Sequence, residues 1–188
     1  AEALARMGVG KMTLVDHDVV SGSNMNRQLV ALRSTVDVLK ADVIAARIKD
    51  INPDCQVTLI TDFLTPESIP TVLSQDYDVV IDAIDSLSSK AALLETAWRN
   101  EMTVFASMGA GGKLDPTQVK TGDLMDTSIC KLAKHLRGQL RKRGIGRGIQ
   151  TVYSLEAPLP PLPPEPVSRG RARAVNGTVS YMPSIFGL

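Results

Sequence analysis

Acidic, amide and basic side chains follow one another in the segment VDHDVVSGSNMNRQ (15–28). Asp16 ends the apolar run KMTLVD, and in doubly wound α/β folds an acidic residue at such a strand end commonly binds ribose hydroxyls. Asn24 and Arg27 follow, and Lys40 comes in the first turns of the next predicted helix. Arginine binds phosphate as a bidentate fork, and lysine binds it as a point charge. Singly these residues fit a solvated polar loop, whereas their order favours a nucleotide site.

A second group of carboxylates lies in DAIDS (82–86), where Asp82 and Asp85 end another apolar run. The carboxyl edge of a parallel sheet is where ligands bind in such folds, and a carboxylate there can hold a Mg²⁺ ion that bridges phosphates. The alternative is that Asp85 or Ser86 caps the helix that follows.

Alternating strand and helix patterns must position these groups. We expect strands near 11–16, 56–61, 78–83 and 103–107, with helices near 34–51, 66–74 and 88–99 between them. This alternation predicts an α/β fold with a mainly parallel sheet. After Gly109 we expect a glycine loop and a hairpin that turns near Asp115. An amphipathic helix follows, with Ile129, Leu132, Leu136 and Leu140 facing inward.

Charge divides the chain unevenly. Residues 1–126 carry 11 Lys and Arg against 18 Asp and Glu, a net charge of −7, whereas residues 127–188 carry 10 against 2, a net charge of +8. We therefore predict a core over 1–126 and a basic extension over 127–188 that packs on it and binds an anionic partner. A solvated basic surface is the alternative. The cations expected to bind are Lys134, Arg137, Arg141, Lys142, Arg143, Arg171 and Arg173.

Only two cysteines occur, Cys55 and Cys130, and the sequence has no CxxC pair. A four-cysteine zinc site within the chain is therefore excluded, and we expect no zinc. Because a disulfide framework is also disfavoured, we expect a reducing compartment, the cytoplasm, while membrane association or an organelle stays open. No apolar stretch is long enough for a membrane-spanning helix.

The motifs VDHDVVSGSNMNRQ, Lys40 in LKAD, INP and DAIDS, in this order over residues 1–126, resemble the E1-like superfamily that includes ThiF, MoeB and HesA. The resemblance implies a Rossmann-like adenylation fold that binds ATP and Mg²⁺, usually as a homodimer. It implies that Asp16 binds the ribose, that Asn24, Arg27 and Lys40 hold the phosphates, and that Asp85 binds Mg²⁺ or positions the reacting groups. Asp18 would hold the ATP-binding side chains in position. Arg27, Lys40 and Asp85 would be catalytic.

Three further segments, GAGGKLDPTQVKTGDL (109–124), VYSLE (152–156) and NGTVSYMPSIFG (176–187), resemble the tRNA threonylcarbamoyladenosine dehydratases of this superfamily. The implied reaction is ATP-dependent cyclisation of threonylcarbamoyladenosine at position 37 of tRNA. The basic part of the chain would bind the tRNA phosphates.

Alternatives remain. The same fold could adenylate a ubiquitin-like sulfur carrier, although such enzymes commonly carry zinc-binding CxxC pairs. An NAD-dependent oxidoreductase would use Asp16 but gives no reason for Asn24, Arg27 and Lys40. The family's glycine-rich phosphate loop and the strand before it are absent from the sequence, so we expect a chain truncated at both ends. We also expect a break in the sheet between the strands at 11–16 and 78–83. An inactive binding module is therefore a further alternative.

Overall fold

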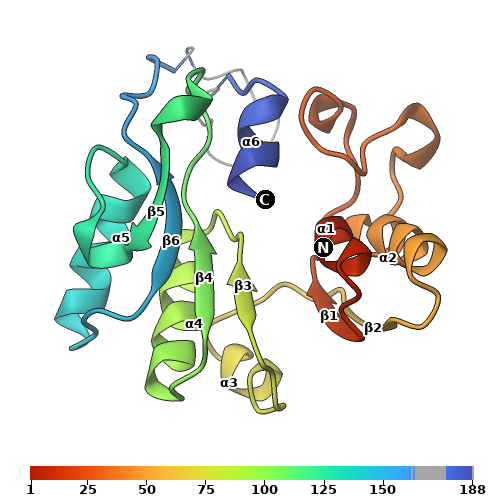
Figure 1. Cartoon of the computed structure of the whole chain (residues 1–188), viewed down its shortest axis with the longest axis horizontal. Helices are drawn as coiled ribbons and strands as arrows, with labels where there is room; N and C mark the ends of the chain where they lie inside the picture. The colour runs from red at the N-terminus through yellow and green to blue at the C-terminus, as the bar shows by residue number, and fades with distance from the viewer. Residues whose placement is uncertain (162, 164–176, 188) are drawn as a thin grey trace. The chain divides into compact units, whose positions relative to one another are not determined.

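The computed structural model describes residues 1–161, 163 and 177–187. Up to residue 107 its α-helices and strands alternate (Figure 1). Contacts divide the chain into two compact units, residues 1–65 and 66–187, each of which is described by itself. The helices are α1 (Glu2–Arg6), α2 (Lys40–Ile51), α3 (Ile69–Val72), α4 (Leu87–Arg99), α5 (Lys131–Lys142) and α6 (Tyr181–Phe186). The strands are β1 (Lys11–Val15), β2 (Gln56–Ile60), β3 (Val80–Asp82), β4 (Val104–Ser107), β5 (Val119–Asp123) and β6 (Gln150–Ser154).

The first unit is a parallel pair of strands with two helices. β1 pairs with β2 from Lys11 opposite Gln56 to Val15 opposite Ile60. Its core is a cluster from α1, β1, α2 and the residue before β2, made of Ala5, Met12, Ile48 and Cys55. This cluster is small, because alternation in β1 and helical periodicity in α2 supply only a few inward side chains each.

Helix α2 begins later than the sequence predicts. A helix from Ser34 or Thr35 is expected, but only a short 3-10 helix, η2 (Arg33–Thr35), forms there, and Asp37 has a φ of 66°. The chain is then held in an extended bridge, because Val20 donates to the carbonyl of Val38 at 2.8 Å. A residue with positive φ interrupts a right-handed helix, so α2 starts at Lys40.

The second unit contains a four-stranded sheet in the order β3–β4–β6–β5. β3 pairs with β4 and β4 with β6 in parallel, while β5 runs antiparallel to β6. Along β3 and β4 the buried residues alternate with Ile81 and Phe105, which are exposed. Helix α4 packs against β3 and β4 and also against α5.

Two predictions for the C-terminal part are wrong. Residues 109–123 do not form a hairpin that turns near Asp115, because β5 pairs with β6, about 30 residues further on. Instead, Asp115 caps a 3-10 helix, η3 (Pro116–Gln118), by accepting a bond from the Thr117 amide. Ile129 lies before α5 with a φ of 64° and is 55% exposed, so it is not part of the helix's inward face.

The α/β class and the dominance of parallel pairing are confirmed. The expected break is also confirmed, since β1 and β3 belong to different sheets. The compact units, however, divide between Thr65 and Pro66, and β6 from the basic part lies inside a sheet. The change of charge at residue 126 therefore does not coincide with a structural boundary, and a separate role for 127–188 stays a prediction. Among the described helices, none is long and apolar enough to cross a membrane.

Candidate functional site

The carboxyl end of β1 turns sharply and presents two carboxylates. The Asp16 amide donates to the carbonyl of Ile60 at 3.1 Å, so the parallel ladder extends to this residue. Asp16 Oδ1 then accepts a bond from the Asp18 amide at 2.9 Å. Such a bond from an aspartate side chain to the backbone two residues on stabilises a tight turn. Asp16 therefore lies at the strand end, as the sequence predicts.

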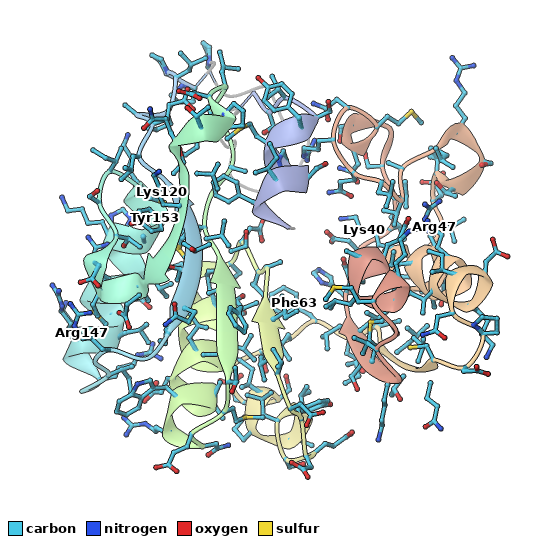
Figure 2. All side chains as sticks on the ribbon, viewed as in Figure 1. Lys40, Arg47, Phe63, Lys120, Arg147 and Tyr153 are labelled. Atoms are coloured by element: carbon cyan, nitrogen blue, oxygen red, sulfur yellow. The ribbon has the colours of Figure 1, made fainter. Side chains whose placement is uncertain are left out.

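Lys40 is held against this turn by two bonds to Asp18. The Lys40 amide donates to the Asp18 carbonyl at 2.9 Å, and Lys40 Nζ lies 2.7 Å from Asp18 Oδ2. The Lys40 side chain is 14% exposed and that of Asp18 is 53% exposed. The hydrogen bond from Lys40 lowers the pKa of Asp18 below its ordinary value. The bridge that delays α2 thus places Lys40, the first residue of that helix, beside Asp18. Figure 2 labels Lys40.

His17 lies between the two aspartates and contacts both the turn and an aromatic ring. Its Nε2 is 3.3 Å from Asp18 Oδ1. Its ring packs edge to face on that of Phe63, with 4.8 Å between the ring centroids. Ligand atoms of Asp16, His17 and Asp18 all lie within 4.8 Å of one another. Exposed groups of this kind are common without a metal ion, and the geometry alone assigns none.

Asn24 and Arg27 come from the loop after this turn. Residues Gly22–Asn24 form a 3-10 helix, η1, in which Asn24 Oδ1 accepts a bond from the Ser21 amide at 3.1 Å. Asn24 is 8% exposed, so its side-chain oxygen supports the loop. Arg27 is half-buried, and its Nη1 donates to the carbonyl of Ser23 and to Asn26 Oδ1, each at 2.9 Å. The guanidinium is thereby oriented through one of its nitrogens.

The second unit holds the other predicted carboxylate. Asp85 is exposed in the loop that joins β3 to α4, so it occupies the carboxyl edge of that sheet as expected. Asp82 does not share this environment. It is fully buried and forms an ion pair with Lys90 of α4, with 2.7 Å between Oδ2 and Nζ. Burial raises the pKa of Asp82, whereas Lys90 and the Ile84 amide act in the opposite direction.

The basic side chains in and near α5 form two sets, one exposed to solvent and one bonded to other residues of the protein. Ala133, Leu136 and Leu140 are buried on its inner side. The exposed residues recur at helical spacing and form one outer stripe, composed of Lys131, Lys134, His135, Arg141 and Lys142. Arg141, Lys142 and Arg143, three of the cations expected to bind an anionic partner, are all exposed.

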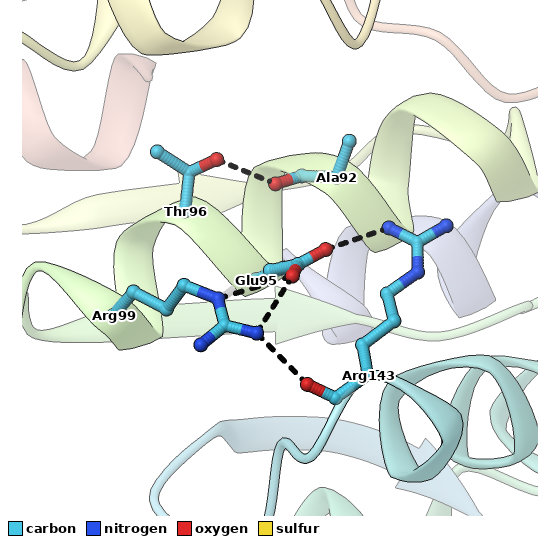
Figure 3. A network of polar contacts seen from close by, with 5 residues as sticks. All are labelled: Ala92, Glu95, Thr96, Arg99 and Arg143. Carbon is cyan, nitrogen blue, oxygen red and sulfur yellow. Dashed lines mark hydrogen bonds and ion pairs between the residues drawn. The ribbon is translucent and has the colours of Figure 1, made fainter.

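Four other arginines, in or near α5, have partners within the protein. Arg137 is half-buried and donates to the hydroxyl of Thr127. Arg143 Nη1 donates to Glu95 Oε2 at 2.8 Å, and Arg99 donates both to Glu95 and to the carbonyl of Arg143 (Figure 3). Arg147 binds both carboxylate oxygens of Asp126 (Figure 2 shows its position). Arg171 and Arg173 lie outside the described residues.

The three segments that resemble the dehydratases meet in one cluster. Glu156 accepts bonds from the amides of Leu114 and Asp115 at 2.9 Å, and its carbonyl accepts a bond from Lys113 Nζ. The Tyr181 hydroxyl donates to the carbonyl of Leu114 at 2.7 Å. Residues spread over about 70 positions therefore fix one loop after β4. The sequence contains the three segments but gives no sign that they touch.

Comparison with known proteins decides the family. The model of the ThiF family matches residues 1–187. The chain belongs to the ThiF family.

Two relatives of this ThiF-family chain are tRNA threonylcarbamoyladenosine dehydratases. The one from Escherichia coli (strain K12) is 46% identical over 164 residues, which are 84% of this chain and 61% of the relative. The one from Bacillus subtilis (strain 168) is 43% identical over 159 residues, covering 85% of this chain and 63% of the relative. The chain thus spans about three fifths of the length of these curated relatives.

A solved structure has the same fold. The crystal structure of the E. coli dehydratase TcdA in complex with ATP matches with a TM-score of 0.87 and 41% identity. The match covers 99% of this ThiF-family chain and 74% of that chain. The Rossmann-type fold of the E1-like proteins is thereby confirmed.

Proposed function

We propose that this chain binds ATP and activates a carboxylate in the cyclisation of threonylcarbamoyladenosine on tRNA. The observation that carries the proposal is the turn after β1, where Asp16, Asp18 and Lys40 lie together. It occurs in a family in which a relative 41% identical has been crystallised with ATP. The cluster around Glu156 supports the choice of substrate, because it joins the segments that resemble the dehydratases.

Each side chain around this turn has a distinct role in the proposal. Asp16 accepts bonds from the ribose hydroxyls. Lys40 and Arg27 bind phosphate oxygens, Lys40 as a point charge and Arg27 through donors other than Nη1. Asn24 donates from its amide nitrogen, since Oδ1 already accepts from Ser21. Asp18 holds Lys40 Nζ until phosphate oxygens compete for it.

Asp85 fits a Mg²⁺ site, whereas Asp82 does not. Mg²⁺ prefers oxygen ligands and usually binds through one or two carboxylates, several waters and substrate phosphates. Asp85 is an exposed carboxylate at the carboxyl edge of the sheet. Asp82 is fully buried against Lys90 and has no open position for a metal. A bound Mg²⁺ would neutralise charge on the phosphates during transfer.

The chemistry follows from the weak electrophilicity of a carboxylate. A carboxylate oxygen of the threonylcarbamoyl group attacks the α-phosphorus of ATP, and pyrophosphate leaves. The neighbouring carbamoyl group then attacks the activated carbonyl carbon, which closes a ring and expels AMP, while an N–H proton of the carbamoyl group is released to solvent. Arg27 and Lys40 stabilise the charge that develops on the phosphates in the first step.

The outer stripe of α5 is the proposed contact with tRNA phosphates. Lys131, Lys134, Arg141 and Lys142 are exposed on one side of a single helix, and phosphate contacts require accessible cations. Arg137 and Arg143 are left out of the stripe because they have protein partners. We further propose a homodimer, on the resemblance to E1-like proteins, and a cytoplasmic location, because two distant cysteines disfavour a disulfide framework.

The test is ATP turnover with defined RNA. The protein is incubated with ATP, Mg²⁺ and tRNA that carries or lacks the threonylcarbamoyl group, and AMP and the nucleoside mass are measured. We expect AMP only with the modified tRNA, together with loss of one water from the nucleoside. Arg27→Ala and Lys40→Ala should each lower the rate about 10²–10³-fold. Pyrophosphate exchange that depends on a sulfur-carrier protein instead of tRNA would overturn the proposal.

A further inference from the structure

The loop that carries Asp85 is tied down by a buried lysine. Lys90 lies in the first turns of α4 and is 0% exposed, which is rare for a lysine. Because side chains of a helix lean toward its N-terminus, Lys90 reaches back to the loop before α4. Its Nζ lies 2.7 Å from Asp82 Oδ2, 2.9 Å from the carbonyl of Ser107 and 3.1 Å from the carbonyl of Ile84.

These three acceptors match the three donors of an ammonium group. They come from the end of β3, the end of β4 and the loop between β3 and α4. Asp82 completes the arrangement, because its Oδ1 accepts a bond from the Ile84 amide at 3.0 Å. Asp82 Oδ2 has no hydrogen-bond partner in the described residues besides its ion pair with Lys90.

Ile84 is therefore held on both sides, at its amide by Asp82 and at its carbonyl by Lys90. Asp85 is the next residue, so the position of its Cα is fixed by this pair. A buried ion pair often contributes no more to stability than apolar residues of similar volume would. Stability alone therefore does not account for the pair, whereas its bonds to both sides of Ile84 point to orientation of the loop.

We propose that Lys90 and Asp82 form a clamp that positions Asp85 for its role in ATP-dependent activation. The inference rests on the proposed function of Asp85. Lys90 is a positioning residue here, because all three of its donors are used inside the protein and it lies away from solvent.

The test replaces both members of the clamp at once. Lys90→Met alone would leave a buried carboxylate without a partner and could unfold the protein. The double variant Asp82→Asn/Lys90→Met keeps both volumes and an oxygen that accepts from the Ile84 amide, so we expect it to fold. Leu94→Ala, a fully buried residue of the same helix, is the control for lost stability alone.

Hydrogen exchange gives a readout that does not depend on activity. In the double variant, the amides of residues 83–86 should exchange at least about tenfold faster, while those in the middle of α4 keep the parent rate. Leu94→Ala should not single out this loop. Unchanged exchange at residues 83–86 would overturn the proposal.

A double-mutant cycle with Asp85→Asn then tests whether the clamp acts through Asp85. At a temperature where all variants are folded, the double variant should lower kcat about 10–100-fold with KM for tRNA unchanged. In the Asp85→Asn background the same change should cost less than about twofold. Equal losses in both backgrounds would overturn the clamp and leave the role of Asp85 intact. If Asp85→Asn keeps the parent rate, the proposed role of Asp85 fails, and the clamp with it.

Discussion

Replacing Lys134, Arg141 and Lys142 by alanine should weaken tRNA binding in a way that depends on salt. All three side chains are exposed on the outer stripe of α5, and alanine preserves the helix. Each phosphate contact contributes about 0.7–0.9 to the slope of log affinity against log salt concentration. Loss of three contacts should therefore flatten the slope by about 2–3.

This change of slope sets the expected magnitude. Between 50 and 200 mM salt, the ratio of parent to variant affinity should shrink about 20- to 40-fold, because salt lowers the gain from counterion release at three phosphates that only the parent contacts. The assay is filter binding of tRNA over that salt range. Affinity for ATP should stay the same, since α5 carries none of the residues that we assign to ATP.

The matched control removes the same amount of charge from arginines that already have partners. Arg99, Arg143 and Arg147 each bind a carboxylate, so their replacement by alanine lowers net charge equally but removes cations that are locally neutralised. The slope should change much less in this control. Equal slopes for the stripe variant and the parent, or equal changes in both triple variants, would refute the assignment of the stripe.

Three further outcomes are expected. Leu136→Ala, a fully buried change in α5, should cost about 2–5 kcal/mol of unfolding free energy, seen as a lower Tm in calorimetry; a cost near zero would contradict the packing. Arg137→Ala should lower Tm but leave the salt slope of tRNA binding unchanged, because its guanidinium binds Thr127. Lys40→Met should raise the pKa of Asp18 in an NMR titration, since Lys40 lowers that pKa in the parent. The stability that this pair adds is lost as pH falls through the pKa of Asp18 in the folded state. An unchanged pKa would show that the contact is absent in solution.

Local patterns in the sequence were sufficient for part of the site. The alternation in KMTLVD predicts a strand that ends at Asp16; β1 ends at Val15, and the Asp16 amide still donates to the carbonyl of Ile60. Helical spacing predicts the buried face of α5 at Leu136 and Leu140. Lys40 was expected in the first turns of a helix and is the first residue of α2. These features depend on periodicity over a few residues, which the sequence contains directly.

Contacts between distant residues could not be predicted in this way. β5 pairs with β6 instead of closing a hairpin, and Glu156 fixes the loop at Leu114, because strand partners and loop anchors are chosen by packing of the whole unit. The start of α2 depends on a bridge between Val19 and Leu39 that local helix propensity does not reveal.

Charge was the least informative signal on its own. The sequence shows ten cations after residue 126, but it does not distinguish exposed lysines from arginines that bind Glu95, Asp126 or Thr127. The sequence likewise gives no sign that Lys90 is buried. Nor does it show that Asp82 pairs with Lys90 and is not available to bind a ligand at the carboxyl edge of the sheet. The residue types were determined by the sequence. The tertiary structure decides which charged side chains pair with one another and which are exposed to solvent, since burial and distance set how strongly charges interact.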